Sequence, residues 1–259
     1  MPGQPLSILV ADDVEVNRKL ALLMLKALGH AAHAVGNGRE ALEAAQRNDY
    51  DVVLMDVRMP DMDGFAATRA ITELLGDARP RIVGVTASAM ESERDNCLAA
   101  GMDDYLPKPF TPATLAAVLL RVARSLQHEA GAPSDPNPFG LAPAGAPAAD
   151  QPIDWTRLDS LRPYDADGSL VREATGAFVR DGPRYLAAMS DALAAGDRDA
   201  LGAAAHALKG AAANVGARNL EAACREVETL ARADQLPRAA KAVSHCARDL
   251  KKAVRALKK

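Results

Sequence analysis

Residues 51–64 read DVVLMDVRMPDMDG, an apolar run that ends on an acidic residue and is followed by turn-forming residues. The run is short and rich in β-branched side chains, which predicts a strand over residues 51–55. Asp56 then stands at the carboxyl end of that strand, and Pro60 and Gly64 mark the turn beyond it. The stretch therefore predicts a strand with a carboxylate at its end.

The same pattern recurs on both sides of this stretch. From residue 6 to residue 126, short apolar runs alternate with longer amphipathic segments, which is typical of a parallel sheet covered by helices. The other predicted strands are 6–11, 32–35, 81–86 and 104–106. The predicted helices are 15–28, 38–47, 65–75, 91–100 and 112–126.

Polar residues interrupt this pattern where the predicted strands end. Asp12 and Asp13 follow the first strand, and Asp56 follows the third. Thr86 closes the fourth strand, and Lys108 comes just after the fifth. Because the carboxyl ends of parallel strands face one crevice, we expect these residues to converge. Three crowded carboxylates without histidine or cysteine suit a hard cation such as Mg²⁺, and a lysine and a hydroxyl beside them favour phosphoryl transfer onto an aspartate.

Four segments of this half resemble the motifs of response-regulator receiver domains: ILVADDVEVNRKL, VVLMDVRMPDMDG, IVGVTASAM and DYLPKPF. The resemblance covers residues 6–126 and implies an α/β fold, a five-stranded parallel flavodoxin-like (βα)5 receiver. It also implies that Asp56 is the phosphoacceptor and a metal ligand. Thr86 and Lys108 are then expected to bind the phosphoryl group.

The resemblance further implies a set of residues around the phosphoacceptor. Asp12 and Asp13 are expected to bind Mg²⁺, together with the backbone carbonyl of Arg58. Tyr105 matches the aromatic residue that rotates inward when the hydroxyl residue is drawn to the phosphoryl group. Val14 departs from the family pattern, in which many members have an acidic or amide residue, and this leaves the lifetime of the phosphoryl group open.

The composition changes to Pro, Ala and Gly over residues 127–151, which predicts a linker between two domains, 1–126 and 152–259. Beyond it no strand pattern appears, and amphipathic segments predict an all-α helical bundle. Gly182 and Pro183 are expected to separate the first two helices of that bundle. The predicted helices are 168–180, 183–195, 198–214, 217–232 and 235–257.

His206 lies in the segment AHALKGAAANVGA, within the third of these helices. With Leu208 at the centre of the apolar stripe, His206 falls about 160° away around the helix and is expected to point to solvent. Lys209 is expected to one side. The small residues expected around the imidazole are Gly202, Ala203, Gly210 and Ala213. An imidazole in such surroundings is accessible to a docking partner, and a nearby cation can hold phosphoryl oxygens.

The segment is similar to the active face of histidine phosphotransfer domains, in which a lysine and a glycine stand three and four residues after the histidine. The resemblance runs from about Trp155 to residue 259. It implies that His206 carries a phosphoryl group and that Lys209 assists it.

The composition argues against several other classes. A net charge of −3 gives no electrostatic footprint of a nucleic-acid binder. No apolar run approaches the ~18 residues needed to span a bilayer, and the first residues lack a signal-peptide pattern, so we expect no membrane association and a cytoplasmic location. Three cysteines far apart in the sequence indicate neither a disulfide framework nor a thiolate metal site.

Together these features predict a two-component phosphorelay protein that accepts a phosphoryl group on Asp56 and carries one on His206. We expect a sensor or hybrid histidine kinase upstream, a response-regulator receiver downstream, and transfer between the two sites of one chain. The protein is expected to be a carrier more than an enzyme, because no Gly-rich nucleotide loop of a kinase is found. Receiver followed by phosphotransfer domain is also the order at the end of hybrid histidine kinases.

Two alternatives come from other classes. An Asp-nucleophile phosphatase also uses carboxylates, Mg²⁺, Thr and Lys, but it is expected to have Asp-x-Asp after its first strand, where this chain has adjacent Asp12 and Asp13. Turnover of small phosphate esters would favour it. A regulatory scaffold without phosphorylation chemistry would take up no label on either Asp56 or His206.

Overall fold

The computed structural model describes residues 4–86, 91–127 and 151–258 of the 259-residue chain. The chain forms two compact units, Met1–Ala142 and Pro143–Lys259. Only the two end residues of the predicted linker, 127–151, belong to the described part. Among the described residues, no helix combines the length and apolar character that a bilayer-spanning segment needs.

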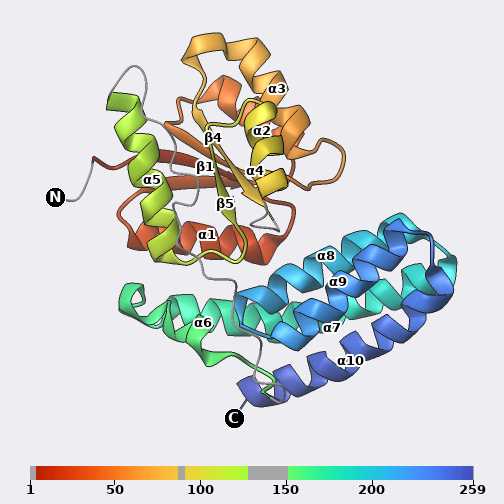
Figure 1. Ribbon diagram of the computed structural model, residues 1–259. Coiled ribbons are helices and arrows are strands. Elements are labelled where there is room, and N and C mark those ends of the chain that lie inside the picture. Colours follow the sequence, from red (N-terminus) through yellow and green to blue (C-terminus); the bar gives the residue numbers. More distant parts are fainter. Residues whose placement is uncertain (1–3, 87–90, 128–150, 259) are drawn as a thin grey trace. The chain divides into compact units, whose positions relative to one another are not determined.

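The first unit is built on a parallel sheet with the strand order β2-β1-β3-β4-β5 (Figure 1). Its strands are β1 (Ser7–Ala11), β2 (Ala31–Val35), β3 (Val52–Asp56), β4 (Arg81–Thr86) and β5 (Asp104–Pro107). The predicted strands are confirmed to within one residue at each end. In this order β1 lies between β2 and β3, so the chain reverses direction across the sheet there, and a crevice is expected at the carboxyl ends of β1 and β3.

Helices cover both faces of this sheet. Figure 1 shows α1 and α5 on one face and α2, α3 and α4 on the other. Asn37 and Asp63 cap α2 and α3, because their side chains accept hydrogen bonds from the backbone N–H groups of Glu40 and Ala66. The bounds are α1 (Glu15–Ala27), α2 (Gly38–Arg47), α3 (Gly64–Leu75), the 3₁₀ turn η1 (Gly76–Ala78), α4 (Glu91–Ala99) and α5 (Pro112–Gln127).

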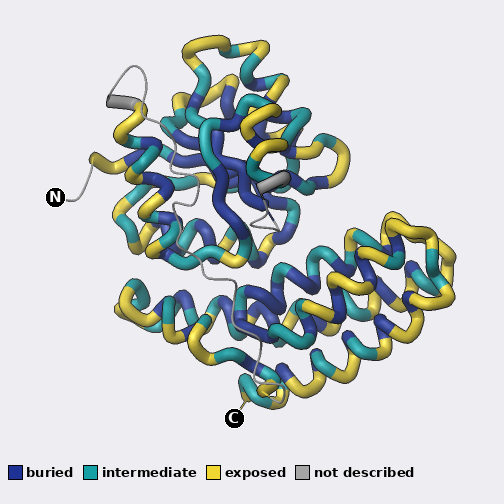
Figure 2. Tube along the Cα trace, viewed as in Figure 1, coloured by how far each residue is buried: buried dark blue, intermediate teal, exposed yellow. Residues whose placement is uncertain are grey.

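The sheet forms the core of this unit. All five residues of β3 and the last four residues of β1 are buried, and Figure 2 shows the strands as the buried centre between the helices. A strand that is buried on both faces needs an unbroken apolar run, which the sequence supplies. In β1 and β3, polar side chains are therefore confined to the strand ends, where the site is built.

The second unit consists of helices only among its described residues. Helices α7 to α10 pack against one another, α8 against both α7 and α9, and α10 against both α7 and α9. Phe178, Leu208 and Val227 are fully buried between them. The short α6 was not predicted, because five residues are too few to show a helical period. The elements are α6 (Trp155–Asp159), the 3₁₀ turn η2 (Arg162–Tyr164), α7 (Ser169–Ala195), α8 (Arg198–Asn214), α9 (Arg218–Arg232) and α10 (Leu236–Leu257).

The predicted helix break at Gly182 and Pro183 is wrong, because α7 runs unbroken through both residues. Gly182 is buried, and a Cβ atom there would lie 2.9 Å from Cδ1 of Leu250 and 3.8 Å from Cδ1 of Leu208. The glycine therefore permits close packing against α8 and α10 and does not end the helix. Pro183 is exposed and removes one intrahelical hydrogen bond, which the surrounding packing tolerates.

Candidate functional sites

Three carboxylates of the first unit gather at the carboxyl ends of β1 and β3. Asp12 and Asp13 directly follow β1, and Asp56 is the last residue of β3. One ligand-forming oxygen of each lies within 4.8 Å of the others. The pairing of β1 with β3, in which Ala11 lies opposite Met55, sets this convergence.

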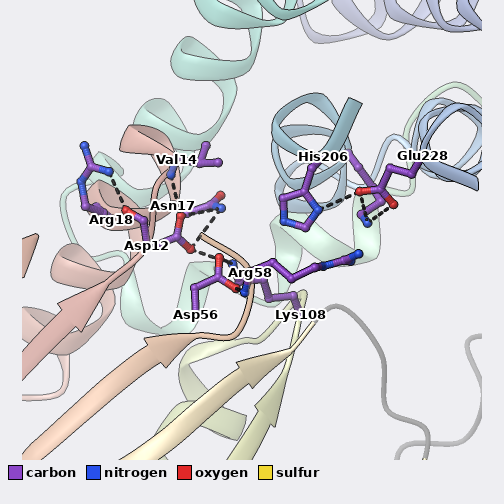
Figure 3. Close-up of polar contacts among 10 residues, drawn as sticks. Asp12, Val14, Asn17, Arg18, Asp56, Arg58, Lys108, His206 and Glu228 are labelled. Carbon is purple, nitrogen blue, oxygen red and sulfur yellow. Dashed lines mark hydrogen bonds and ion pairs between the residues drawn. The ribbon is translucent and has the colours of Figure 1, made fainter. Parts of the chain in front are cut away.

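Lys108 connects two of these carboxylates across the sheet (Figure 3). Its Nζ atom lies 2.7 Å from Oδ2 of Asp12 and 2.5 Å from Oδ2 of Asp56. Burial alone would lower the pKa of Lys108, but the charges of Asp12 and Asp56 outweigh burial and raise this pKa. The lysine therefore stays protonated and partly neutralises the acidic cluster.

Local hydrogen bonds fix the orientation of Asp12. Its Oδ1 atom accepts a hydrogen bond from the backbone N–H of Val14 at 2.9 Å and another from Nδ2 of Asn17 at 3.2 Å. The guanidinium of Arg18 donates to the Asp12 carbonyl at 2.6 Å. The first turn of α1 thus holds Asp12 in place, and Val14 contributes through its backbone even though its side chain departs from the family pattern.

Asp13 is the least satisfied member of the cluster. Its Oδ1 atom is buried and has no hydrogen-bond partner among the described residues. Burial, and secondly the negative charge of Asp12, raise the pKa of Asp13. An oxygen-only set of donors with one unsatisfied buried oxygen suits a hard divalent cation, which would relieve both costs.

Asp56 is buried, and its Oδ1 atom accepts a hydrogen bond from the backbone N–H of Arg58 at 3.2 Å. The turn beyond it depends on Gly64, because a Cβ atom there would lie only 2.2 Å from the Asp56 carbonyl oxygen. The N–H of Gly64 also donates to the Val57 carbonyl at 3.0 Å. Gly64 thus allows the start of α3 to lie directly against the carboxyl end of β3.

Two further residues predicted for this site, Thr86 and Tyr105, lie on β4 and β5. Thr86 is fully buried at the end of β4, and its carbonyl accepts a hydrogen bond from the N–H of Lys108 at 2.6 Å. Tyr105 is buried in the apolar cluster that includes Ile82 and Met102. The role of the Arg58 carbonyl as a metal ligand stays a prediction.

The second unit contains a separate polar cluster, drawn in Figure 3, between α8 and α9. The Nδ1 atom of His206 lies 2.7 Å from Oε1 of Glu228. The ammonium of Lys209 donates to both oxygens of the same carboxylate, at 2.7 Å and 2.5 Å. Burial raises the pKa of Glu228, but the hydrogen bonds from His206 and Lys209 and their charges outweigh burial and lower this pKa to about 2. Glu228 is therefore an anion that holds both neighbours.

The predicted exposure of this face is wrong in part. The His206 side chain is only 17% exposed, and the Lys209 side chain only 9%. Ala213 is buried, Gly202 and Gly210 are half-buried, and only Ala203 of the predicted small residues is exposed. The projection of a single helix could not show that α9 covers one side of His206.

Both halves of the chain match known family models. Residues 8–120 match the response regulator receiver domain, and residues 173–259 match the Hpt domain. The chain joins a receiver domain to an Hpt domain. The acidic cluster with Asp56 belongs to the receiver domain, and the cluster of His206, Lys209 and Glu228 belongs to the Hpt domain.

Similar proteins include sensor kinases that match most of this chain. The aerobic respiration control sensor protein ArcB of Escherichia coli (strain K12) is 28% identical over 231 residues, which is 88% of this chain and 28% of ArcB. The sensor histidine kinase GacS of Pseudomonas protegens is 34% identical over 229 residues, 86% of this chain and 24% of GacS. The chain therefore spans about a quarter of the length of these relatives.

A solved receiver domain is similar to the first unit. It comes from a sensor histidine kinase of Pseudomonas aeruginosa PAO1 and is described with a magnesium ion coordinated in its active-site cleft. It is 41% identical, covers 47% of this chain and 100% of its own, and has a TM-score of 0.44.

Glu228 is the main residue of the Hpt domain that the sequence reasoning missed. It stands on the buried stripe of α9, four residues after Cys224 and three before Ala231, both of which are buried. A carboxylate on the buried face of a helix is costly unless a cation pairs with it. The position of Glu228 on the apolar stripe of α9 was therefore the signal available in the sequence. The identity of that partner, 19 residues away in Lys209, required the packing of α9 on α8.

Proposed function

We propose that this chain is a phosphorelay protein, which accepts a phosphoryl group on Asp56 and carries one on His206. The observation that carries the proposal is the presence, in one chain, of a buried carboxylate cluster bridged by Lys108 and an imidazole oriented by Glu228. The family matches of the two units support it. The adjacent Asp12 and Asp13 give the phosphatase alternative no support.

In the receiver domain, we assign Mg²⁺ binding to Asp12, Asp13, Asp56 and the Arg58 carbonyl. When bound, the ion would neutralise negative charge on an incoming phosphoryl group. An Asp56 carboxylate oxygen attacks phosphorus, a new P–O bond forms, and the donor leaves with the electron pair of the old bond. Lys108 and Thr86 bind the phosphoryl oxygens, and Tyr105 is assigned the switch role.

In the Hpt domain, we assign the phosphoryl group to Nε2 of His206. Because anionic Glu228 accepts a hydrogen bond from Nδ1–H, the neutral imidazole keeps its lone pair on Nε2. That lone pair attacks the acyl phosphate of a receiver, so that a P–N bond forms, the P–O bond breaks and the carboxylate is restored. Lys209 acts through Glu228, because its ammonium favours the anionic carboxylate.

The proposed partners follow from these two chemistries. A phosphohistidine of a sensor or hybrid kinase is the proposed donor to Asp56, and the acceptor aspartate of a separate receiver is the proposed destination for the group on His206. We also propose that the two sites of one chain exchange the group. In these roles the protein is a carrier and not a kinase.

The function is tested by labelling the full chain with a radioactive small phosphodonor and Mg²⁺. We expect Asp56→Asn to abolish receiver labelling, because an amide is a poor nucleophile and a poor metal ligand. The exposed Asp77→Asn is the matched control and should label normally. Undiminished labelling of Asp56→Asn would remove this residue from its role.

The Hpt site is tested by acid-labile label after incubation with a phosphorylated receiver. His206→Gln should take up none, whereas His245→Gln on α10 should label as wild type does. Acid-labile label in His206→Gln would move the carrier function to another histidine. Profiling against the purified sensor kinases of the source organism would then identify the donor.

Exchange within one chain is tested by dilution. If label passes from Asp56 to His206 inside a molecule, its rate does not depend on protein concentration. A rate proportional to concentration would contradict this exchange, and so would complementation between Asp56→Asn and His206→Gln at the wild-type rate.

A further inference from the structure

Two cysteines of the Hpt domain face each other in its core. Cys224 on α9 and Cys246 on α10 are fully buried, are both free thiols, and have their Sγ atoms 3.8 Å apart. A disulfide has an S–S distance of about 2 Å, so the two sulfur atoms would need to approach by roughly 1.8 Å. A side-chain rotation with a small shift of two packed helices provides a movement of this size.

The cysteine pair is connected to the His206 site through Glu228, which lies on the same helix as Cys224. Cys224 precedes Glu228 by four residues on α9, so both side chains lie on the same face of the helix. The charges of Glu228 and Lys209 both act on the Cys224 thiol. A force that draws Cys224 towards α10 therefore acts on the turn of α9 that holds Glu228 against His206.

We propose that Cys224 and Cys246 form a reversible redox pair, which joins α9 to α10 under oxidation and disturbs the contact between Glu228 and His206. The oxidant is a peroxide. One thiolate attacks a peroxide oxygen and becomes a sulfenic acid, and the second thiol displaces water from it. In total, two thiols supply two electrons, one hydrogen peroxide becomes two waters, and one S–S bond forms. A dithiol reverses the bond by exchange.

The burial of the pair sets how fast it reacts. The hydrogen bond with Cys246, and then burial, raise the pKa of Cys224, so little thiolate is present in the closed bundle. Oxidation therefore proceeds through transient separation of α9 and α10. Once formed, the disulfide joins two residues that are 22 positions apart in the sequence. It lowers the conformational entropy of the unfolded chain and so stabilises the bundle.

The first test is peptide mapping of the full native chain after hydrogen peroxide, with alkylation of the remaining thiols in denaturant. Trypsin releases residues 219–225 with Cys224 and residues 242–248 with Cys246. We expect these peptides to appear as one species, two hydrogens lighter than their sum, and to separate after dithiothreitol. Cys97, buried in the receiver domain, should remain alkylated as an internal control.

Cys246→Ala should abolish the linked species while circular dichroism confirms the helical bundle. Absence of the linked species in the wild type would overturn the proposal. It would also be overturned if the species formed only in denatured protein, or if links to Cys97 formed in equal yield.

The second test rests on the proposed function and measures transfer of label to His206. In the oxidised protein the transfer rate should fall and should recover with dithiothreitol, whereas Cys246→Ala should not respond to peroxide. A linked species with an unchanged transfer rate would contradict the coupling to Glu228. If the reduced wild type took up no label on His206, the proposed function would fail, while the mapping result would still stand or fall by itself.

Discussion

Replacement of Glu228 by glutamine gives a quantitative test of the Hpt cluster, because it removes the charge and keeps the size of the side chain. The pKa of this carboxyl falls from 4.5 to about 2 on folding. Each unit of pKa is worth about 1.4 kcal/mol, so the ionised carboxylate contributes on the order of 3 kcal/mol to stability. Buried Lys209 loses its charged partner in the variant, which acts in the same direction.

The pH dependence of this effect has a definite sign. The pKa of Glu228 is lower in the folded protein than in the unfolded chain. Its contribution is therefore fully present above pH 4.5 and is lost as the pH falls from about 4.5 towards 2. We expect Glu228→Gln to be less stable than the wild type by about 3 kcal/mol at pH 7, and this difference to shrink to a small part of that value near pH 2.5.

The assay is urea unfolding followed by the fluorescence of Trp155, the single tryptophan of the chain, which reports on the second unit. The exposed Glu226→Gln on α9 is the control and should unfold within ~0.5 kcal/mol of the wild type. Equal stability of Glu228→Gln and the wild type at pH 7 would refute the charge assignment. A difference of the same size at both pH values would instead show that packing, and not ionisation, causes the loss.

Three further substitutions test packing, each by urea unfolding. Gly64→Ala should destabilise the first unit by at least about 2 kcal/mol and abolish labelling of Asp56, because its Cβ atom would lie 2.2 Å from the Asp56 carbonyl oxygen; a stable variant that labels normally would contradict this. Pro183→Ala should stabilise the second unit by about 1–3 kcal/mol, since it restores a helical N–H donor at an exposed position; unchanged stability would mean that this donor stays unpaired. Gly176→Ala should also stabilise α7, by about 0.5–1 kcal/mol, because the added Cβ atom would contact no neighbouring side chain. Gly182→Ala should not stabilise α7, because its Cβ atom would be too close to Leu250; equal effects of the two substitutions would refute this.

The sequence was most informative where an apolar strand changes to a polar residue at its carboxyl end. Four of the five strands of the receiver domain, all except β2, end at or just before a polar residue, and the rule that the carboxyl ends of parallel strands face one crevice then placed Asp12, Asp56 and Lys108 together. The bundle was harder to predict, because helix periodicity gives the buried face of each helix but not the neighbour that covers it. For this reason Glu228 and the contact of Cys224 with Cys246 were not foreseen.

The helix break predicted at Gly182 and Pro183 was wrong for the same reason, because the sequence does not show which helices pack together. Glycine and proline both end helices when only the local chain is considered, but Gly182 is fixed by its contacts with Leu250 and Leu208, which are 68 and 26 residues away. Tertiary packing outweighed local propensity at this position.

The unbroken course of α7 affects how the Hpt domain unfolds. With 27 residues at 1.5 Å each, this helix is about 40 Å long. It contacts both α8 and α10, so two helices share it as a common support. A break at Gly182 would have divided the bundle into two halves able to separate one after the other. A continuous α7 instead spans both ends of the domain, so we expect the amide hydrogens of α7 and α8 to exchange through one shared opening.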